Sequence, residues 1–523
     1  MESPIGMTRR DRGADEVLIA GEEKTAAKLP SLTRWLSMGG AARLLPLKIV
    51  VIDDDPTGSQ TVHGCPLLLR WDPATLDAGL AHPSPLLFLL ANTRALGPSE
   101  ARSRMRELAA ALDQALARAR ERGLLDDWLL VSRGDSTLRG HFPLEVEELA
   151  AALGPFDATL LVPAFLEGGR TTVDGVHRLH GQPVHESDFA RDGLFGYATS
   201  YLPDWVEERS GGRLSAASVQ LVSLTDLEGD PAGLRQRLAA LADQVLVAVD
   251  AERPEHLAAL AAALRDLASS TGDGEASSGS RPRRFLAQSA AGLPAALAAL
   301  PPQPLDAAGL AGLRRRSAAG RPLPGLVMVG SHVPLADAQL ARLLAEPFCR
   351  GIELPVARLH RVLEGPLPDR LLASLEADWR QQLQAVLAEG RTPVLFTSRG
   401  ELRCRHAGER RALGLALAGL MARLGAALAP DLGYLISKGG ITTHTLLADG
   451  LGLHRVDLQG QLLPGLSLVL APVAGGAVAG GGAVAGGAAA VGAGLPVITF
   501  PGNLGEPDTL RQAWAWMERG RPD

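Results

Sequence analysis

Short apolar runs alternate with longer amphipathic stretches along the chain. Segments such as 99–123 repeat Ala, Leu and Arg at helical spacing and lie between runs rich in Leu, Ile and Val. The candidate strands of the first half are 45–52, 85–92, 126–133, 158–165 and 244–250. Because apolar strands joined by helical crossovers are typical of a parallel sheet buried on both faces, this pattern predicts an α/β fold.

The alternation stops in the middle of the chain and then resumes. Ser, Gly and Arg dominate 269–284, and 321–325 reads RPLPG. Further candidate strands follow at 326–330, 392–398, 434–440 and 495–502. A chain of 523 residues is long for one domain. We therefore expect two α/β domains with mostly parallel sheets and a cleft between them. The expected boundaries are an N-terminal extension at 1–45, a first domain at 46–300, a linker at 301–325 and a second domain at 326–523.

Charge and cysteine content narrow the class of protein. The net charge of -6 and the pI near 6.1 provide no basic field for nucleic acid or anionic lipid, so neither partner is expected. The three cysteines, Cys65, Cys349 and Cys404, lie far apart and fit no metal or redox spacing. Acidic and basic residues mix from Glu2 to Lys28, which is unlike an export signal. We expect a cytoplasmic protein.

One uncharged segment needs a separate interpretation. Residues 458–505 carry no charge, but their Gly/Ala tract at 474–494 is poor in the Leu, Ile and Phe that favour membrane insertion. We interpret the tract as a low-complexity loop of uncertain order and expect no membrane span there.

Polar and Gly-rich turns follow the predicted strands, where ligands bind in open α/β sheets. Asp53, Asp54 and Asp55 directly follow the first strand and precede Pro56, Thr57 and Gly58. Neighbouring carboxylates make each other harder to ionise. Such a cluster favours chemistry on a cation or a phosphoryl group.

A second group of polar residues follows the third and fourth strands. If the turn at Asp135 opens a helix, Asp135 and Arg139 share one face of it, and Arg170 follows the Gly168–Gly169 pair. A guanidinium can grip a carboxylate through two hydrogen bonds, which suits an acidic sugar. Alternatively, residues 135–137 cap a helix and Arg139 makes a surface ion pair.

The second half lacks the phosphate-loop pattern GxxxxGK[ST] but has Gly-rich strand ends. The best candidate is Gly439–Gly440 followed by Thr442 and Thr443, which can aim backbone N–H groups and hydroxyls at phosphate oxygens. A plain strand-to-helix turn would use the same glycines. Together the two halves indicate an anionic substrate on the first domain and a phosphate-bearing ligand on the second.

These motifs, in this order, resemble the four-carbon acid sugar kinase family, the ATP-dependent kinases of erythronate, threonate and oxo-tetronate type acids. The resemblance covers roughly 46–300 and 325–515. It is carried by DDPTG, DSTLRG, PAFLEGGRTTVDG with the following GQPVHESDFARD, VGSHVP, TSRGE, GGITT and PGNLGEPD.

The resemblance implies a kinase that uses ATP and Mg²⁺ on a small acid sugar. It implies that 46–300 is a sugar-acid-binding domain, that 326–523 is a nucleotide-binding domain, and that the substrate and nucleotide cleft lies between them. It implies catalytic roles for Asp54, Asp55 and Asp135. It implies substrate contacts by Thr57, Gly58, Ser136, Thr137, Arg139, Gly168, Gly169 and Arg170. It implies ATP contacts by Ser331, Ser398, Gly439, Gly440, Ile441, Thr442, Gly502, Asn503 and Gly505. It assigns no metal ligand, and a homodimer is expected only on general grounds.

The expected mechanism is positioning and charge neutralisation. Asp54 or Asp55 accepts the proton of the attacking hydroxyl, with Asp135 sharing that work, while Arg139 and Arg170 anchor the acid and Mg²⁺ bridges the ATP phosphates. Two alternatives remain. Asp53-x-Asp55-x-Thr57 also resembles haloacid-dehalogenase-type phosphatases, with Asp53 as nucleophile, and a non-catalytic sugar-acid sensor could use the same two-domain cleft.

Overall fold

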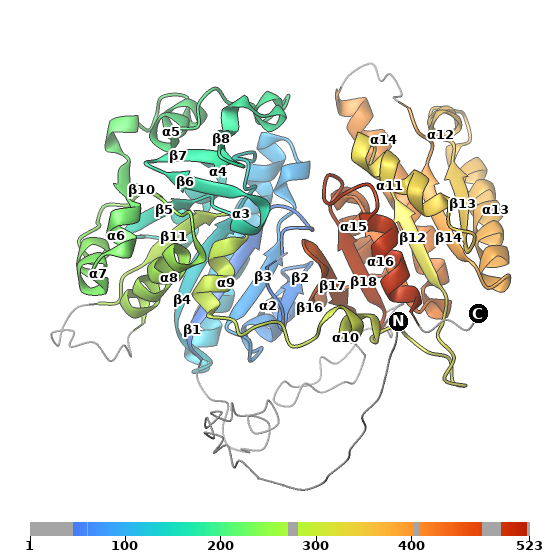
Figure 1. Cartoon of the computed structure of the whole chain (residues 1–523), viewed down its shortest axis with the longest axis horizontal. Coiled ribbons are helices and arrows are strands. Elements are labelled where there is room, and N and C mark those ends of the chain that lie inside the picture. Colours follow the sequence, from blue (N-terminus) through green and yellow to red (C-terminus); the bar gives the residue numbers. More distant parts are fainter. Residues whose placement is uncertain (1–44, 60, 270–280, 401–406, 473–492, 520–523) are drawn as a thin grey trace, which may run out of the picture. The chain divides into compact units, whose positions relative to one another are not determined.

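The computed structural model describes residues 45–519 except 60, 270–280, 401–406 and 473–492. Fifteen of the described strands form one large mixed sheet, whose course can be followed in Figure 1. Eight strands of the first half pair in parallel. In sheet order they are β2 (Cys65–Leu68), β3 (Leu86–Leu90), β1 (Leu45–Asp53), β4 (Leu125–Arg133), β11 (Phe285–Ser289), β5 (Ala158–Val162), β10 (Val245–Val249) and β9 (Gln220–Val222).

The second half contributes another parallel set. In sheet order it comprises β13 (Cys349–Leu354), β14 (Thr392–Thr397), β12 (Gly325–Val329), β15 (Tyr434–Lys438) and β18 (Pro496–Phe500). Two strands, β16 (Arg455–Leu463) and β17 (Leu466–Leu470), lie between the sets and pair antiparallel with β2, with each other and with β18 (Figure 1). This hairpin makes the sheet continuous through residues 42–523, which form one compact unit by their contacts.

Helices pack on the sheet and bury its strands. All five residues of β3, β5, β12, β15 and β18 are buried, as expected for parallel strands covered on each side. The helices of the first half are α2 (Pro73–Leu80), α3 (Pro98–Glu121), α4 (Leu144–Leu153), α5 (Leu202–Ser210), α6 (Leu224–Glu228), α7 (Pro231–Ala239), α8 (Pro254–Ala268) and α9 (Gly292–Ala298). Those that follow are α10 (Ala307–Ala311), α11 (Pro334–Leu344), α12 (Val356–Leu363), α13 (Pro368–Ala388), α14 (Ala407–Leu428), α15 (Gly440–Thr445) and α16 (Thr509–Glu518).

Two helices illustrate how sequence produces this packing. Pro98 begins α3, and Met105, Leu108 and Leu112 lie along its buried face. The described chain contains one helix, Gly408–Asp431, that is long and apolar enough to cross a membrane, and 56% of its most apolar window is buried inside the protein. It packs against α13 and α15 as a core helix.

The predicted α/β fold with mostly parallel strands is confirmed. Each candidate strand coincides with an observed one within a few residues, and the candidate helix at 99–123 is α3. The structure adds β2, β9, β11, β13 and the hairpin β16–β17, which the apolar pattern missed, and a small antiparallel sheet of β6 (Arg170–Val173), β7 (Val176–Leu179) and β8 (Gln182–Pro183). The domain boundaries stay a prediction. The extension up to residue 44, Cys404 and nearly all of the Gly/Ala tract lie outside the described residues.

Strand register explains where a site can form. Asp53 of β1 pairs with Arg133 of β4, which pairs with Ser289 of β11, which pairs with Val162 of β5. These four strands therefore end level, and the loops that follow them share one edge. In the second half, Val329 of β12 is level with Lys438 of β15, which is level with Phe500 of β18, so the loops after these three strands also start level.

Candidate functional site

The acidic loop after β1 is neutralised by arginines from two neighbouring strand ends. Arg94 donates from Nε to Asp54 Oδ2 at 2.8 Å and from its terminal nitrogen to Asp54 Oδ1. Arg133, the last residue of β4, lies 3.3 Å from both Asp53 Oδ1 and Asp54 Oδ1. The crowding of three carboxylates is therefore offset by the protein's own cations.

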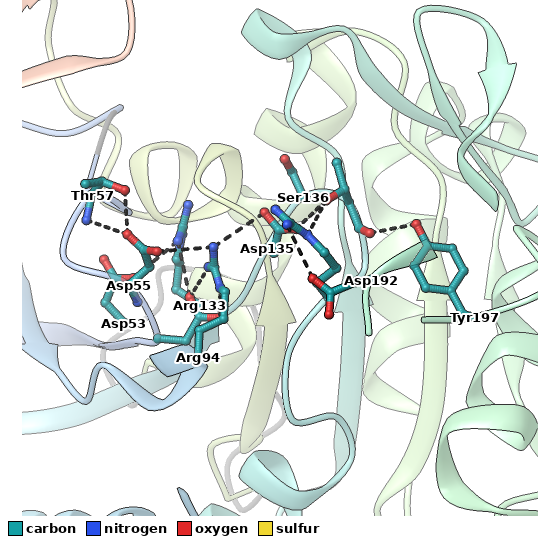
Figure 2. A network of polar contacts seen from close by, with 12 residues as sticks. Asp53, Asp55, Thr57, Arg94, Arg133, Asp135, Ser136, Asp192 and Tyr197 are labelled. Atoms are coloured by element: carbon teal, nitrogen blue, oxygen red, sulfur yellow. Dashed lines mark hydrogen bonds and ion pairs between the residues drawn. The ribbon is translucent and has the colours of Figure 1, made fainter. Parts of the chain in front are cut away.

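Arg94 is the centre of this network, and sequence reasoning did not identify it. Figure 2 shows its guanidinium between Asp55, at 3.4 Å, and Asp135, at 3.7 Å. Arg94 lies in the turn after β3, where its backbone N–H donates to Asp54 O. A signal was present, because Arg94 follows the second apolar run by only a few residues and ligand-binding loops follow such strands.

Asp55 is the most accessible carboxylate of the acidic loop. Its side chain is 22% exposed, whereas those of Asp53 and Asp54 are 1% and 2% exposed. Burial would raise the pKa of Asp55, but the Arg94 guanidinium and two hydrogen bonds from Thr57 outweigh it, and the pKa lies below its ordinary value. Asp55 is therefore ionised at neutral pH.

Asp53 is sealed beneath the loop. A Cβ placed at Gly58 would lie 2.2 Å from Asp53 Oδ1 and 2.4 Å from a terminal nitrogen of Arg133. Burial raises the pKa of Asp53 to about 7, against the opposing effect of Arg133. Gly58 thus has a packing role, because only a residue without a side chain fits over this buried ion pair.

Residues 135–139 form a turn and not the first turn of a helix. Leu138 N donates to Asp135 O at 3.1 Å, and Leu138 has a φ of 63°. The expected pair still forms, because Arg139 Nε donates to Asp135 Oδ2 at 2.8 Å and Thr137 donates to the same oxygen. Burial opposes ionisation of Asp135, yet Arg94 and Arg139 hold its pKa well below the ordinary value. Arg139 is 20% exposed, so it is not a simple surface ion pair.

Buried neighbours hold this turn in place. His177 Nε2 lies 2.8 Å from Ser136 O. Tyr197, whose side chain points toward this turn in Figure 2, donates from its hydroxyl to Thr137 O at 2.7 Å. Burial lowers the pKa of His177 to about 4, so His177 is neutral at pH 7 and its Nε2–H can donate to the carbonyl. Ser136 and Thr137 therefore have backbones fixed by the core.

The Gly168–Gly169 turn places Arg170 near the Asp135 carboxylate. Gly169 has a φ of 71°, and a Cβ at this position would lie 2.3 Å from His180 Nδ1. Arg170 donates to Gly168 O, while its Nε is buried without a partner among the described residues. Burial lowers the pKa of Arg170, and the opposing influence comes from Asp135. Arg170 thus belongs to the Asp135–Arg139 side of the site.

The glycine loops of the second half converge on Ser331. A Cβ at Gly439, whose φ is 117°, would lie 3.3 Å from Ser331 N, and one at Gly502 would lie 2.6 Å from Ser331 Oγ. Thr442 lies against Gly330, the residue before Ser331, because a Cβ at Gly330 would lie 2.0 Å from Thr442 Oγ1. Loops after β12, β15 and β18 therefore meet in contact.

Four other residues with predicted ATP contacts lie at different places around these loops. Ser398 Oγ accepts from Val356 N at 2.9 Å, so this hydroxyl caps the start of α12. Ile441 is 41% exposed, and Asn503 and Gly505 are exposed in the loop after β18. A Cβ at Gly505 would lie 2.5 Å from Thr509 Oγ1, which indicates a packing role for this glycine.

Lys438 links the glycine loop after β15 to the one after β18, and sequence reasoning did not identify this role. It is fully buried, donates from Nζ to Pro501 O at 2.8 Å and lies 3.8 Å from the centre of the Phe500 ring. Burial lowers its pKa to about 7. Lys438 ties the end of β15 to the end of β18.

The acidic loop and the Gly439–Gly440 loop lie against each other. A Cβ at Gly440 would lie 3.6 Å from both carboxylate oxygens of Asp55 and 3.5 Å from Pro56 Cγ. Asp55 is thus shared by the two sets of loops, and a ligand on one set is within reach of a ligand on the other. This arrangement suits transfer of a small group between two bound molecules.

Two family models match successive parts of the chain. Residues 49–297 match the family model of a sugar-binding N-terminal domain, and residues 326–510 match that of a nucleotide-binding C-terminal domain. The chain is 29% identical over 410 residues to D-threonate kinase of Cupriavidus necator, covering 75% of this chain and 80% of that protein. It is 31% identical over 154 residues to D-erythronate kinase of Heliobacterium modesticaldum, covering 28% of this chain and 32% of that protein.

Solved structures share the fold. A Salmonella typhimurium protein superimposes with a TM-score of 0.58 at 17% identity, covering 91% of this chain and 99% of that one. A Haemophilus influenzae protein gives a TM-score of 0.52 at 17% identity, covering 89% and 99%. At this identity the likeness concerns the fold alone.

Proposed function

The chain belongs to the four-carbon acid sugar kinase family, and we propose that it transfers the γ-phosphoryl group of ATP to a hydroxyl of a threonate, erythronate or oxo-tetronate type acid. The observation that carries this proposal is the proximity of the Asp55 carboxylate to Gly440, where a Cβ would lie 3.6 Å from both of its oxygens. It places a carboxylate of the sugar-binding half against a glycine loop of the nucleotide-binding half.

On the sugar side, we assign proton acceptance to Asp55. Asp54 is a weaker candidate because Arg94 and Arg133 occupy its oxygens and its side chain is buried. Asp55 is ionised and partly exposed, so it can accept the hydroxyl proton as the oxygen attacks phosphorus. Asp135 lies on the other side of Arg94 and is the second candidate.

Arg139 and Arg170 are the proposed anchors of the substrate carboxylate. Arg139 uses Nε for Asp135, and its guanidinium stacks 4.9 Å from the Phe189 ring centre. Arg170 has one buried nitrogen without a partner among the described residues. One terminal nitrogen of Arg139 also lies 3.8 Å from Asp192 Oδ2. A carboxylate placed between the two guanidinium groups would pair with both cations through charge-assisted hydrogen bonds.

On the nucleotide side, the hydroxyl of Ser331 and the backbone of Gly439, Gly440 and Gly502 form the proposed phosphate cradle. The donor set also fits a Mg²⁺ ion carried by ATP, since such ions take one or two carboxylates and several phosphate oxygens. Asp55 would hold it, because it is the most exposed of the three carboxylates. The ion would neutralise phosphate charge.

The two alternative functions have less support. A phosphatase of the haloacid-dehalogenase type needs Asp53 as nucleophile, but Asp53 is 1% exposed, covered by Gly58 and paired with Arg133. A sensor would not need a carboxylate at the meeting point of the two halves. We further propose a cytoplasmic location and a homodimer, both as expected from the sequence.

The test is ADP release from Mg-ATP in the presence of a panel of threonate, erythronate and oxo-tetronate stereoisomers. Asp55→Asn should lower kcat by at least about 100-fold, the lower end for a lost general base. Asp266→Asn is the matched control, because Asp266 is exposed and pairs only weakly with Arg235 at 3.5 Å. ADP release that no acid stimulates would refute the proposal, as would phosphate release from a sugar phosphate without nucleotide.

A further inference from the structure

A small cavity is lined by Asp135 and Arg139 of the site together with residues that the site has not used so far. Its volume is about 20 Å³, enough for one hydroxyl group or one water molecule. Its polar lining includes Asp54, Asp135, Arg139, Glu145, Trp205 and Gln288. The mechanism above uses neither Trp205 nor Gln288.

Gln288 comes from the central strand β11, which ends level with β4. Its side chain is 9% exposed, and its Oε1 is buried without a hydrogen-bond partner among the described residues. The amide is held against the turn of the site, because a Cβ at Gly134 would lie 2.5 Å from Gln288 Nε2. Gly134 therefore gives the Gln288 amide its place next to Asp135.

Trp205 supplies the complementary group. It lies in α5, is 2% exposed, and its ring centre is 4.7 Å from that of Phe142. Its Nε1–H is buried and also has no partner in the described chain. The cavity is thus lined by one residue with a free acceptor and one with a free donor.

A buried polar atom without a partner costs about 1–3 kcal/mol, so this pair is expected to gain a partner when the site is occupied. A hydroxyl group can donate one hydrogen bond and accept another, which matches the two unpartnered atoms. Neither atom carries a formal charge, so a hydroxyl suits them better than the substrate carboxylate does.

We propose that Gln288 and Trp205 form a specificity subsite for one non-reacting hydroxyl of the four-carbon acid. The proposal rests on the kinase function proposed above. It assigns recognition of the carboxylate to the arginines and recognition of hydroxyl position and configuration to this cavity.

The experiment compares the preferred acid with its 2-deoxy and 3-deoxy analogues, using kcat/KM at saturating Mg-ATP. The wild-type enzyme should discriminate against one analogue by about 5- to 150-fold, the equivalent of one lost buried hydrogen bond. Gln288→Met keeps the side-chain volume but removes the amide. It should lower kcat/KM for the hydroxylated acid, leave that for the deoxy analogue nearly unchanged, and so abolish most of the discrimination. Trp205→Phe should act in the same direction.

Gln339→Met is the matched control. Gln339 is fully buried, and its Oε1, like that of Gln288, has no partner within the described ranges, but its Nε2 donates to Leu504 O and Glu506 O in the nucleotide half. Gln339→Met is expected to leave the ratio of acid to deoxy analogue unchanged, whatever it does to the KM for ATP.

Three outcomes would overturn the subsite. They are no discrimination by the wild type, an equal loss on both substrates in Gln288→Met, or no change on either. Equal losses would mean that Gln288 only supports the fold, and unchanged rates would mean that water alone fills the cavity. Absence of turnover by the wild type with every four-carbon acid would instead contradict the kinase function.

Discussion

Removing the Arg94 guanidinium should destabilise the protein in a pH-dependent way. In Arg94→Met, Asp54 loses its bidentate partner, and Asp55 and Asp135 lose a cation at 3.4 and 3.7 Å. Arg94 is 18% exposed and Asp54 is 2% exposed, so the pair is largely desolvated. Breaking a buried pair from one side costs about 3–5 kcal/mol, and we expect a loss of that size in the free energy of unfolding at neutral pH.

The pH dependence follows from the pKa values of Asp55 and Asp135. Arg94 helps to hold both below the ordinary value of 3.8, so these groups contribute stability that is present above pH 3.8 and is lost only as pH falls through the folded-state pKa. Without Arg94, burial raises both pKa values, and protonation relieves the cost in acid. The destabilisation by Arg94→Met should therefore be largest at pH 7.5 and smaller at pH 5.

Urea unfolding followed by tryptophan fluorescence measures this loss at the two pH values. The double variant Arg94→Met/Asp54→Asn removes both members of the bidentate pair and should recover at least about 1 kcal/mol relative to the sum of the single variants. A loss below about 1 kcal/mol at pH 7.5, an equal loss at both pH values, or strict additivity would refute this account of the network.

Three further outcomes follow from the packing around the site. Gly58→Ala should cost about 3 kcal/mol of unfolding free energy in urea titrations, the upper end for overpacking, because the new Cβ would lie 2.2 Å from Asp53 and 2.4 Å from Arg133. Asp53, with its pKa raised to about 7, contributes stability that is complete below pH 3.8 and is lost as pH rises through 7. Asp53→Asn should therefore remove a decline of up to about 4 kcal/mol between pH 4 and 7, and an unchanged decline in unfolding free energy would contradict the burial argument. Gly502→Ala places a Cβ 2.6 Å from Ser331 Oγ and should raise the KM for ATP several-fold in steady-state assays without changing that for the acid, so an effect on the acid alone would count against the cradle.

The strands that sequence reasoning found are those with long apolar runs. β11 was missed because it is short and follows a Ser, Gly and Arg-rich stretch, although it is a central strand and carries Gln288. The hairpin β16–β17 was missed although β16 begins with the polar residues Arg455, Asp457 and Gln459 at alternate positions. The residues of β16 alternate between intermediate and buried along its whole length. That alternation is the signal that could have identified it.

The sequence predicted which loops form the candidate site but not the contacts between them. The order of the motifs located the acidic loop and the glycine loops, but the pairing of Arg94 with three carboxylates depends on the level ends of β1, β3 and β4. No local pattern encodes such a contact between loops. Likewise, the turn at 135–139 places Asp135 and Arg139 together through a positive φ at Leu138 and not through helical spacing.

The central claim is that a phosphoryl group passes in one step from ATP on the Gly439–Gly440 loop to the acid sugar beside Asp55. ATP made chiral at its γ-phosphorus with oxygen isotopes, used with the preferred acid, tests this most directly. Direct in-line transfer predicts inversion of configuration at phosphorus in the sugar phosphate. Retention would show two successive transfers through a phosphorylated enzyme group and would contradict the account.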